Sequence, residues 1–217
     1  MRAEQIRKTY GRRVVLHTEP MTLEQGRIYA VLGANGSGKS TLAKILAGLE
    51  KPDSGERPLP SAVRVGYLPQ RPYAFRMSTE RNLLTASDDR ERMKELIQSL
   101  NLTELSRAKS HHLSGGETAR MALARVLMKP FDLLILDEPS ASMDMESAYL
   151  AEKAIADYRD RYNTAVLLIT HSTGQARRLG EELIFLSEGK IAESGDLAVH
   201  LREPSSAEFR RFLEFQQ

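Results

Sequence analysis

Short apolar runs alternate along this chain with segments whose apolar residues recur every three or four positions. A continuous apolar run predicts a strand buried on both faces, whereas three-to-four spacing predicts a helix with one buried face. Their alternation favours an α/β fold with a largely parallel sheet. The expected strands are Ile28–Leu32, Val65–Leu68, Phe131–Leu136, Thr164–Thr170 and Leu183–Ser187.

Helical spacing predicts helices at Lys39–Leu49 and Ser147–Tyr162. The polar segment Thr79–Lys109 also has helical spacing and predicts a small helical lobe. Three prolines and a glycine in Glu50–Ala62 predict a loop or an edge structure. Near the end of the sequence, Ser205–Glu208 has the pattern of a capping box, which begins a helix.

Composition narrows the class of protein. The 217 residues are 41% hydrophobic and 28% charged, which is typical of a globular chain with one domain or a core domain and a small satellite. The net charge is +2 and basic residues are scattered among acids, so no nucleic-acid partner is expected. Cysteine is absent, which excludes disulfides and thiolate metal sites. No apolar run approaches the ~20 residues of a membrane span, and Met1–Tyr10 lacks the apolar core of a secretory signal. We therefore expect a cytosolic protein, and any function at a membrane is expected to depend on a membrane-bound partner.

A glycine-rich segment lies between the strand Ile28–Leu32 and the helix Lys39–Leu49. It fits the phosphate-loop (P-loop) pattern G-x-x-x-x-G-K-[ST], in which glycines let backbone N–H groups turn toward phosphate oxygens. In this pattern Lys39 reaches the β- and γ-phosphates and the Ser40 hydroxyl binds Mg²⁺. A glycine-rich turn without a ligand is the alternative, and the flanking strand and helix weigh against it. The expected ATP-binding residues are Gly33, Ala34, Asn35, Gly36, Ser37, Gly38, Lys39, Ser40 and Thr41.

Two acidic residues, Asp137 and Glu138, follow the apolar strand Phe131–Leu136. Ligands bind at the carboxyl ends of strands in open α/β sheets, so both side chains are expected at a ligand site. There Asp137 can hold Mg²⁺, directly or through water, and Glu138 can orient and deprotonate an attacking water molecule. A solvated strand end is the alternative for this pair alone, but the phosphate loop upstream favours catalysis.

A second glycine pair lies between the phosphate loop and the acidic pair, in the segment Leu113, Ser114, Gly115, Gly116 and Glu117. It precedes the helical stretch Ala119–Met128, and a helix N-terminus of this kind can hold an anion. Simple helix capping by Ser114 is the alternative. In this position the segment resembles the signature motif of ATP-binding-cassette (ABC) ATPases. The resemblance covers about Tyr10 to Gly195, with seven motifs in the order of the family.

The resemblance to ABC ATPases implies roles for further residues, each with a simpler alternative. Tyr10 resembles the aromatic residue that stacks on adenine, although it could be a core tyrosine. Gln70 resembles the Q-loop glutamine that contacts Mg²⁺ and the attacking water, although it could be a polar loop residue. His171 resembles the switch histidine at the γ-phosphate, although a histidine at a strand end is usually structural. Ser142 and Asp144 resemble D-loop residues that face a partner subunit.

The same resemblance implies a P-loop NTPase fold. A single cassette of residues 1–217 is expected to have a nucleotide-binding core of 1–70 and 131–217, an antiparallel edge subdomain and a small helical subdomain of 71–130 that carries the signature. The departures from the family pattern are modest: Glu117–Arg120 after the glycines, Met143 in the D-loop, Ser172 after the switch histidine and a short interval before Gln70. None of them removes an expected phosphate or Mg²⁺ ligand.

One chain has one phosphate loop and one signature, and the resemblance implies that each ATP lies between the loop of one chain and the signature of another. The chain is thus expected to hydrolyse Mg-ATP in a homodimer or with a sister ATPase. As part of an ABC transporter, it is expected to lie on the cytoplasmic face of the membrane and to bind a permease through a groove near Tyr73, Phe75 and Met77. The alternative for these three side chains is that they pack the helical lobe.

A single cassette without a fused membrane domain resembles prokaryotic importers. The segments Phe75–Thr79 and Gly174–Leu179 resemble those of tungstate-type oxyanion importers. The main alternative function is a soluble ABC ATPase outside transport, such as an iron–sulfur cluster assembly factor. A P-loop kinase is a weaker alternative, because a kinase has no use for Leu113–Glu117.

Overall fold

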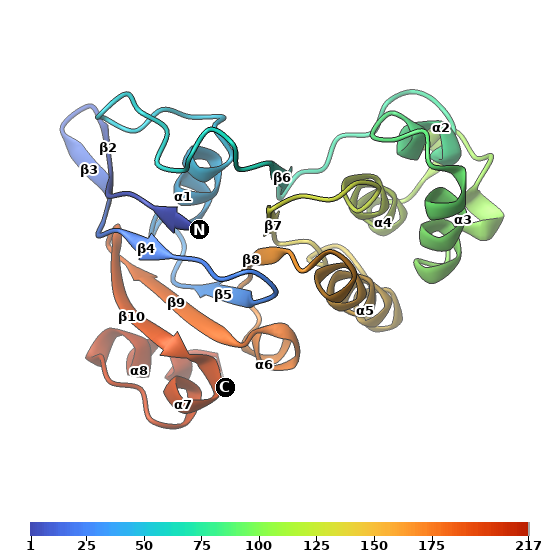
Figure 1. Ribbon diagram of the computed structural model, residues 1–217. Coiled ribbons are helices and arrows are strands. Elements are labelled where there is room, and N and C mark those ends of the chain that lie inside the picture. The colour runs from blue at the N-terminus through green and yellow to red at the C-terminus, as the bar shows by residue number, and fades with distance from the viewer. Residues whose placement is uncertain (217) are drawn as a thin grey trace. The chain divides into compact units, whose positions relative to one another are not determined.

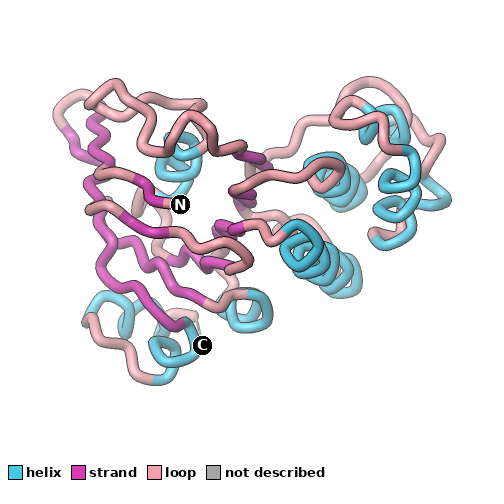
Figure 2. Tube along the Cα trace, viewed as in Figure 1, coloured by secondary structure: helices cyan, strands magenta, loops and turns pink. Residues whose placement is uncertain are grey.

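The computed structural model describes residues 1–216, and the chain divides into two compact units. The first contains Met1–Tyr67, Phe131–Asp137 and the chain from Asn163 onward, and the second contains Leu68–Pro130 and Glu138–Tyr162. Strands are concentrated in the first unit, whereas the second is built mainly of helices and loops (Figures 1 and 2). The expected helical region, 71–130, lies within the second unit, which also includes Glu138–Tyr162.

The first unit contains a six-stranded sheet in the order β10-β9-β5-β8-β7-β6. Strand β5 is parallel to β8 and β9, β7 is parallel to β8, and β10 is antiparallel to its neighbour β9. This largely parallel core confirms the α/β fold class expected from the alternating pattern. The strands are β5 (Ile28–Leu32), β6 (Val65–Leu68), β7 (Leu133–Asp137), β8 (Ala165–Ile169), β9 (Glu182–Ser187) and β10 (Lys190–Asp196).

Two short antiparallel pairs accompany this sheet. Strand β1 (Arg2–Ala3) pairs with β4 (Met21–Thr22), and β2 (Ile6–Tyr10) pairs with β3 (Arg13–Thr18). Their apolar residues join the core beside the central strands, where Ala3, Ile6 and Leu16 are completely buried.

The register of the central strands brings their carboxyl ends to one edge. Val31 of β5 and Asp137 of β7 both pair with Ile169 of β8. Residues that follow these strands therefore emerge together at this edge, where Gly33 starts one loop and His171 lies in another.

Four helices belong to the first unit: α1 (Lys39–Leu46), α6 (Thr173–Leu179), α7 (Leu197–Arg202) and α8 (Ala207–Glu214). One apolar cluster joins Leu42 of α1 to the sheet, and another joins Phe209 of α8 to Leu32 of β5. Strand β5 is thus buried on both sides, as its apolar sequence predicts. Helix α1 ends before the expected Leu49 because Gly48 has a left-handed φ of 74° that ends the helix.

The helices of the second unit are α2 (Thr79–Leu84), α3 (Arg90–Ser99), α4 (Gly115–Val126) and α5 (Met145–Tyr162), with short 3-10 turns at Thr103–Leu105 and Ser110–His112. Side chains of Ser78, Asp89 and Ser114 cap the N-termini of α2, α3 and α4. The cap at Asp89 starts a new helix inside the expected helical stretch Thr79–Lys109, which is therefore divided into separate short elements.

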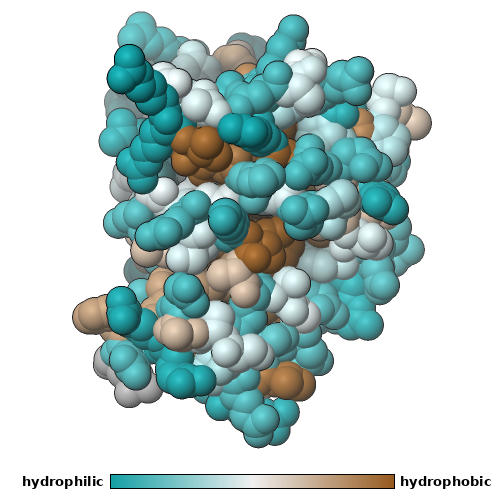
Figure 3. Space-filling view, turned by 90° about the vertical axis from the view of Figure 1, so that its left-hand side faces the viewer, coloured by the Kyte–Doolittle hydropathy of each residue, from teal (hydrophilic) through white to brown (hydrophobic). Residues whose placement is uncertain are grey.

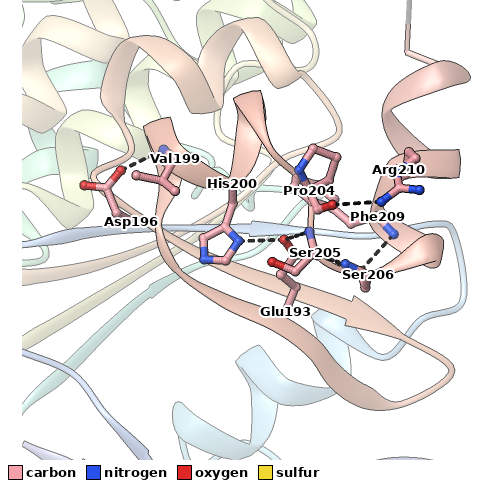
Figure 4. Close-up of polar contacts among 9 residues, drawn as sticks. All are labelled: Glu193, Asp196, Val199, His200, Pro204, Ser205, Ser206, Phe209 and Arg210. Carbon is pink, nitrogen blue, oxygen red and sulfur yellow. Dashed lines mark hydrogen bonds and ion pairs between the residues drawn. The ribbon is translucent and has the colours of Figure 1, made fainter.

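The capping box expected at Ser205–Glu208 is wrong. Ser206 is the N-cap of α8, and its hydroxyl accepts from the Phe209 N–H at 3.1 Å. The N–H groups of Ser205 and Ser206 instead donate to the buried carboxylate of Glu193 on β10, at 2.8 and 2.9 Å (Figure 4). A contact between distant parts of the chain therefore determines where the helix begins.

The described residues include no helix long and apolar enough to cross a membrane. The face drawn in Figure 3 is largely hydrophilic, with separate apolar spots rather than one continuous apolar band.

Candidate functional site

The glycine-rich loop joins β5 to α1 in the first unit. Gly33 and Gly38 have φ values of 152° and 106°, which side chains rarely adopt. A Cβ at Gly33 would lie 2.3 Å from the Leu186 carbonyl oxygen, and one at Gly38 would lie 2.9 Å from the Val15 carbonyl oxygen. Glycine is therefore required at both positions, while Ala34–Gly36 between them are exposed. The loop is an open backbone cradle at the start of a helix, as phosphate binding requires.

Lys39 is buried at the first position of α1, with 6% of its surface exposed. Its ammonium group donates to the carbonyl oxygens of Gly33 and Ala34 at 2.7 and 2.9 Å. The lysine thus lies across its own loop, which places a fixed positive charge where phosphate oxygens would bind.

The side chains of Ser40 and Asp137, the two expected Mg²⁺ ligands within the first unit, lie side by side. Asp137, at the end of β7, is 3% exposed and hydrogen-bonds the Ser40 side chain. Burial raises the pKa of Asp137, while the Ser40 hydrogen bond and the nearby Lys39 oppose that shift. The described residues contain no cluster of three or more His, Cys, Asp or Glu side chains suited to a metal. One carboxylate and one hydroxyl fit Mg²⁺, because this ion commonly takes one or two protein ligands and completes its shell with water and phosphate oxygens.

Two more side chains approach Asp137 within the first unit. The half-buried His171 follows β8, and its pKa is lowered by burial and by Lys39, although Asp137 opposes this shift. Its imidazole is therefore neutral near pH 7, and its ring N–H can donate a hydrogen bond to a phosphate oxygen. Tyr67 of β6 hydrogen-bonds Asp137, and burial and this carboxylate raise the pKa of Tyr67 to about 12. Tyr67 is not among the site residues expected from the sequence, because the pairing of β6 with β7 that brings it to Asp137 is seen only in the folded sheet.

Tyr10 lies at the end of β2 and is 49% exposed, so its ring is accessible to a ligand. Its hydroxyl donates a hydrogen bond to the Glu50 carboxylate, which also pairs with Lys8 at 3.2 Å. The Glu50 hydrogen bond, followed by burial, raises the pKa of Tyr10. The core-tyrosine alternative does not fit this exposure, whereas stacking on a planar base does.

Gln70, Glu138 and Ser142 line one cavity of about 260 Å³ in the second unit. Glu138 is half-buried with a left-handed φ of 54°, which is uncommon for a residue other than glycine. Such backbone strain clusters at functional sites, since it persists only where the surrounding structure fixes it. The cavity thus brings together Gln70 and Glu138, which are expected to act on the attacking water, and Ser142, which is expected to belong to the D-loop.

Ser114 is the N-cap of α4, and Glu117 completes a capping box. The Ser114 hydroxyl accepts from the Glu117 N–H at 3.3 Å, and the Glu117 carboxylate accepts from the Ser114 N–H at 2.7 Å. A Cβ at Gly116 would lie 2.9 Å from the Ser142 carbonyl oxygen, so the signature glycine packs against the D-loop. Capping and anion binding are compatible, because the capping box leaves the first N–H groups of α4 outside its two hydrogen bonds.

The expected groove residues are exposed to different extents. Tyr73 is 64% exposed and Phe75 is 38% exposed, and their rings meet edge to face at 5.2 Å. Met77 is half-buried. The core-packing alternative thus does not describe Tyr73, which projects its ring into solvent.

The fold and the first unit define the chain as a P-loop nucleotide-binding protein. A family model described as ABC transporter matches residues 16–141. The tungstate uptake system ATP-binding protein TupC of Peptoclostridium acidaminophilum is 36% identical over 208 residues, which cover 87% of this chain and 95% of that protein. The zinc import ATP-binding protein ZnuC of Chelativorans sp. is 40% identical over 189 residues, covering 85% and 66%.

Solved structures show the same fold. A dimeric ATP-binding cassette in a post-hydrolysis state, bound to ADP and Pi, has a TM-score of 0.79 at 22% identity and covers 90% of this chain and 98% of its own. An ATP-binding subunit of an ABC transporter has a TM-score of 0.82 at 20% identity, covering 100% and 99%.

The chain belongs to the ABC transporter family. It is an ATP-hydrolysing, nucleotide-binding subunit of this class, as the resemblance of its motifs predicted. These relatives support a role in transport, and they do not support the alternative of an iron–sulfur assembly factor.

Proposed function

We propose that two copies of this chain, or one copy and a sister ATPase, close around two ATP molecules and open after hydrolysis to drive a membrane importer. One observation carries the proposal: each chain has a phosphate cradle at Gly33–Lys39 in its first unit and a second anion-binding helix N-terminus at Ser114–Gly116 in its other unit. A γ-phosphate held in the first cradle can be capped by the second cradle of a partner subunit.

Within this pair the residues have separate roles. Lys39 binds the β- and γ-phosphates, Tyr10 stacks on adenine, and Ser114 with Gly115 and Gly116 binds the γ-phosphate of the opposite nucleotide. Ser40, Gln70 and Asp137 would hold Mg²⁺, which would offset the negative charge of the phosphates.

Two residues act on the water that attacks the γ-phosphate, and a third contacts the phosphate itself. Glu138 accepts a proton from it, and Gln70 orients it. His171 contacts the γ-phosphate as a neutral imidazole. Ser142 and Asp144 position the partner subunit at the closed interface. Asp144 is suited to a fixed position, because its carboxylate accepts from the Ser147 N–H at 2.7 Å and so caps α5.

The permease seat is the Tyr73–Met77 segment. An apolar helix of the membrane subunit fits a surface with two exposed aromatic rings and a methionine. Binding there keeps the chain on the cytoplasmic face of the membrane. The curated relatives take up tungstate, zinc, aliphatic sulfonates and Fe(3+), so we propose import of a small ionic solute.

Replacing Glu138 by Gln tests this proposal. The amide keeps the size of the side chain but cannot take a proton, so hydrolysis should fall by about 10²–10⁴-fold, the usual size of a general-base contribution. ATP still binds, so the variant should accumulate in Mg-ATP as a dimer of twice the 24.3 kDa chain mass on a sizing column. The wild-type chain in ADP should elute as a monomer.

Ser114→Arg in the same background is the matched control. A long cation at the helix N-terminus would block the signature surface without touching Lys39 or Asp137, so the dimer should be lost while ATP binding persists. Normal hydrolysis by Glu138→Gln, or a monomer at every ATP concentration, would overturn the paired mechanism.

A further inference from the structure

Arg125, near the end of α4, holds the Tyr73–Met77 segment with both arms of its guanidinium group. Its Nη2 donates to the Tyr73 carbonyl oxygen at 2.5 Å, and its Nη1 donates to Asn82 Oδ1 at 3.2 Å. Its guanidinium carbon lies 5.1 Å from the centroid of the Phe75 ring. A planar guanidinium makes both polar contacts from one rigid fork while it faces the ring, a geometry that an ammonium group on a flexible stem does not fix.

Asn82 of α2 holds the same segment from within. It is completely buried, and its Oδ1 accepts from the Phe75 N–H at 2.9 Å. Its Nδ2 lies within hydrogen-bond distance of the carbonyl oxygens of Phe75, Met77 and Ser78, at 3.1, 3.3 and 3.1 Å. Because Asn82 Oδ1 serves both Arg125 and the Phe75 N–H, movement of the segment and movement of the arginine are linked through one buried amide.

The segment is exposed on its outer side and anchored beneath. The Phe75 ring is 38% exposed, whereas Arg125 is half-buried and burial lowers its pKa. A partner that covers Tyr73 and Phe75 removes more water from around the guanidinium. Its hydrogen bonds and its contact with the ring strengthen when water is excluded, so occupancy of the segment tightens the connection between the segment and α4.

Helix α4 connects Arg125 to the expected signature residue Ser114 at the other end of the helix. It runs for 12 residues, from Gly115 to Val126, and begins at the capped Ser114. At 1.5 Å per residue it is a rod of about 18 Å, and its continuous hydrogen bonds make it move as one body. A displacement of Arg125 would therefore also displace Ser114.

We propose that Arg125 and Asn82 couple the Tyr73–Met77 segment to the signature helix, so that a permease helix seated on the segment sets the position of Ser114. This inference rests on the proposed function, since it assigns a regulatory connection to the same permease seat. Arg125 is a positioning residue in this scheme: it touches neither nucleotide nor metal.

The alternative is that Arg125 only holds the helical unit together, and Arg92 provides the matched control for that role. Arg92 is 8% exposed, donates through Nε to the Leu127 carbonyl oxygen at 3.4 Å, and lies 5.9 Å from the Tyr162 ring centroid. It thus joins α3 to the end of α4 with the same kinds of contact, but these contacts are made to Leu127, Glu95 and Tyr162 rather than to the Tyr73–Met77 segment.

The experiment uses the reciprocity of coupling: if the segment moves α4, closure at the signature must change the segment. The chain has no cysteine, so Arg76→Cys provides a single thiol for an environment-sensitive fluorophore. Arg76 is exposed and lies at the tip of a tight turn in which the Met77 N–H donates to the Phe75 carbonyl oxygen at 2.7 Å. The label is placed in the full Glu138→Gln chain, and emission and dimer formation are recorded as Mg-ATP is added.

The parent and the Arg92→Lys variant should show an emission shift that follows dimer formation. Arg125→Lys should lose the shift per dimer formed, because lysine keeps the charge but not the two-armed contact. Phe75→Leu removes only the ring that faces the guanidinium, so it should reduce the emission shift. This variant tests the proposal even if Arg125→Lys does not fold.

A full emission shift in dimers of Arg125→Lys and Phe75→Leu would overturn the coupling, as would a parent that dimerises without any shift. A parent that fails to dimerise in Mg-ATP contradicts the proposed function instead. The two failures are therefore distinguished in one titration.

Discussion

The side chain of Ser40, at the start of α1, hydrogen-bonds the carboxylate of Asp137 at the end of β7. These residues are 97 positions apart in the sequence, and the parallel register of the sheet brings them to one edge. The two expected Mg²⁺ ligands are thus paired with each other, and the fixed positive charge of Lys39 lies near Asp137.

Replacing Lys39 by Ala should remove most of the affinity for ATP. The charged hydrogen bonds from its ammonium group to the phosphates contribute about 3 kcal/mol, so the Kd should rise by roughly 100-fold. Lys44→Ala is the control, because it removes a charge from the exposed side of the same helix. Calorimetric titration with Mg-ATP measures both, and an unchanged affinity in Lys39→Ala would refute the assignment of the phosphate loop.

Tyr10→Ala should weaken ATP binding by about 1–2 kcal/mol, the range of a lost stacking contact between an aromatic ring and a base. Tyr10→Phe should bind nearly as well as the wild type, because it keeps the ring and loses only the hydrogen bond to Glu50. Fluorescent-nucleotide titration checks both variants. Equal losses would show that the hydroxyl, rather than the ring, is responsible.

Tyr73→Ser should weaken assembly with the permease subunit at least about tenfold while the isolated chain still hydrolyses ATP, because the lost ring covers apolar surface only in the complex. Tyr149→Ser is closely matched: Tyr149 is also 64% exposed and lies in the same unit. Detergent-solubilised complexes assembled from purified subunits measure this. Equal assembly by both variants would show that Tyr73 does not contribute to binding of the permease subunit.

Glu193→Gln should destabilise the fold in a pH-dependent way. Burial alone would raise the pKa of Glu193, but hydrogen bonds from the Ser206 hydroxyl, the Ser205 and Ser206 N–H groups and His200 outweigh it and lower the pKa from 4.5 to about 2. A lowered carboxyl pKa adds stability above pH 4.5 that is lost as the pH falls through about 2, and its size is roughly 3 kcal/mol.

Urea unfolding at a series of pH values tests this prediction. The wild type and Glu193→Gln should differ most above about pH 5 and converge as the pH approaches 2. Asp196→Asn is the control, since this exposed carboxylate makes one capping hydrogen bond to the Val199 N–H at 2.9 Å (Figure 4). A difference that stays constant with pH would mean that Glu193 acts through packing alone.

The central strands were predictable because burial on both faces leaves a local apolar run. The expected Ile28–Leu32 matches the fully buried β5 residue for residue, and Val65–Leu68 matches β6, an edge strand in which half-buried and buried residues alternate. The family and the transport function were also predictable, because the motifs occur along the chain in the order that is typical of ABC ATPases. Both predictions are confirmed. The roles assigned to individual residues such as Gln70 and His171 stay predictions.

Features that depend on distant contacts were not predictable. The start of α8 at Ser206 is set by a carboxylate on β10, so local spacing placed its cap one residue too early. Arg125 reaches a carbonyl group 52 residues away, and nothing in its own surroundings in the sequence indicates that partner. Backbone carbonyls carry no side-chain signal, so only the folded chain reveals such contacts.

The reciprocal hydrogen bonds of Ser114 and Glu117 have a consequence for the kinetics of closure. This end of α4 is already ordered and capped in the single chain, so it loses little conformational entropy when a second subunit docks. Preorganised surfaces associate without waiting for a segment to fold, and typical rate constants for such docking are about 10⁵–10⁷ M⁻¹ s⁻¹. In the proposed pair of subunits, hydrolysis therefore controls how long the closed state lasts and not how fast it forms.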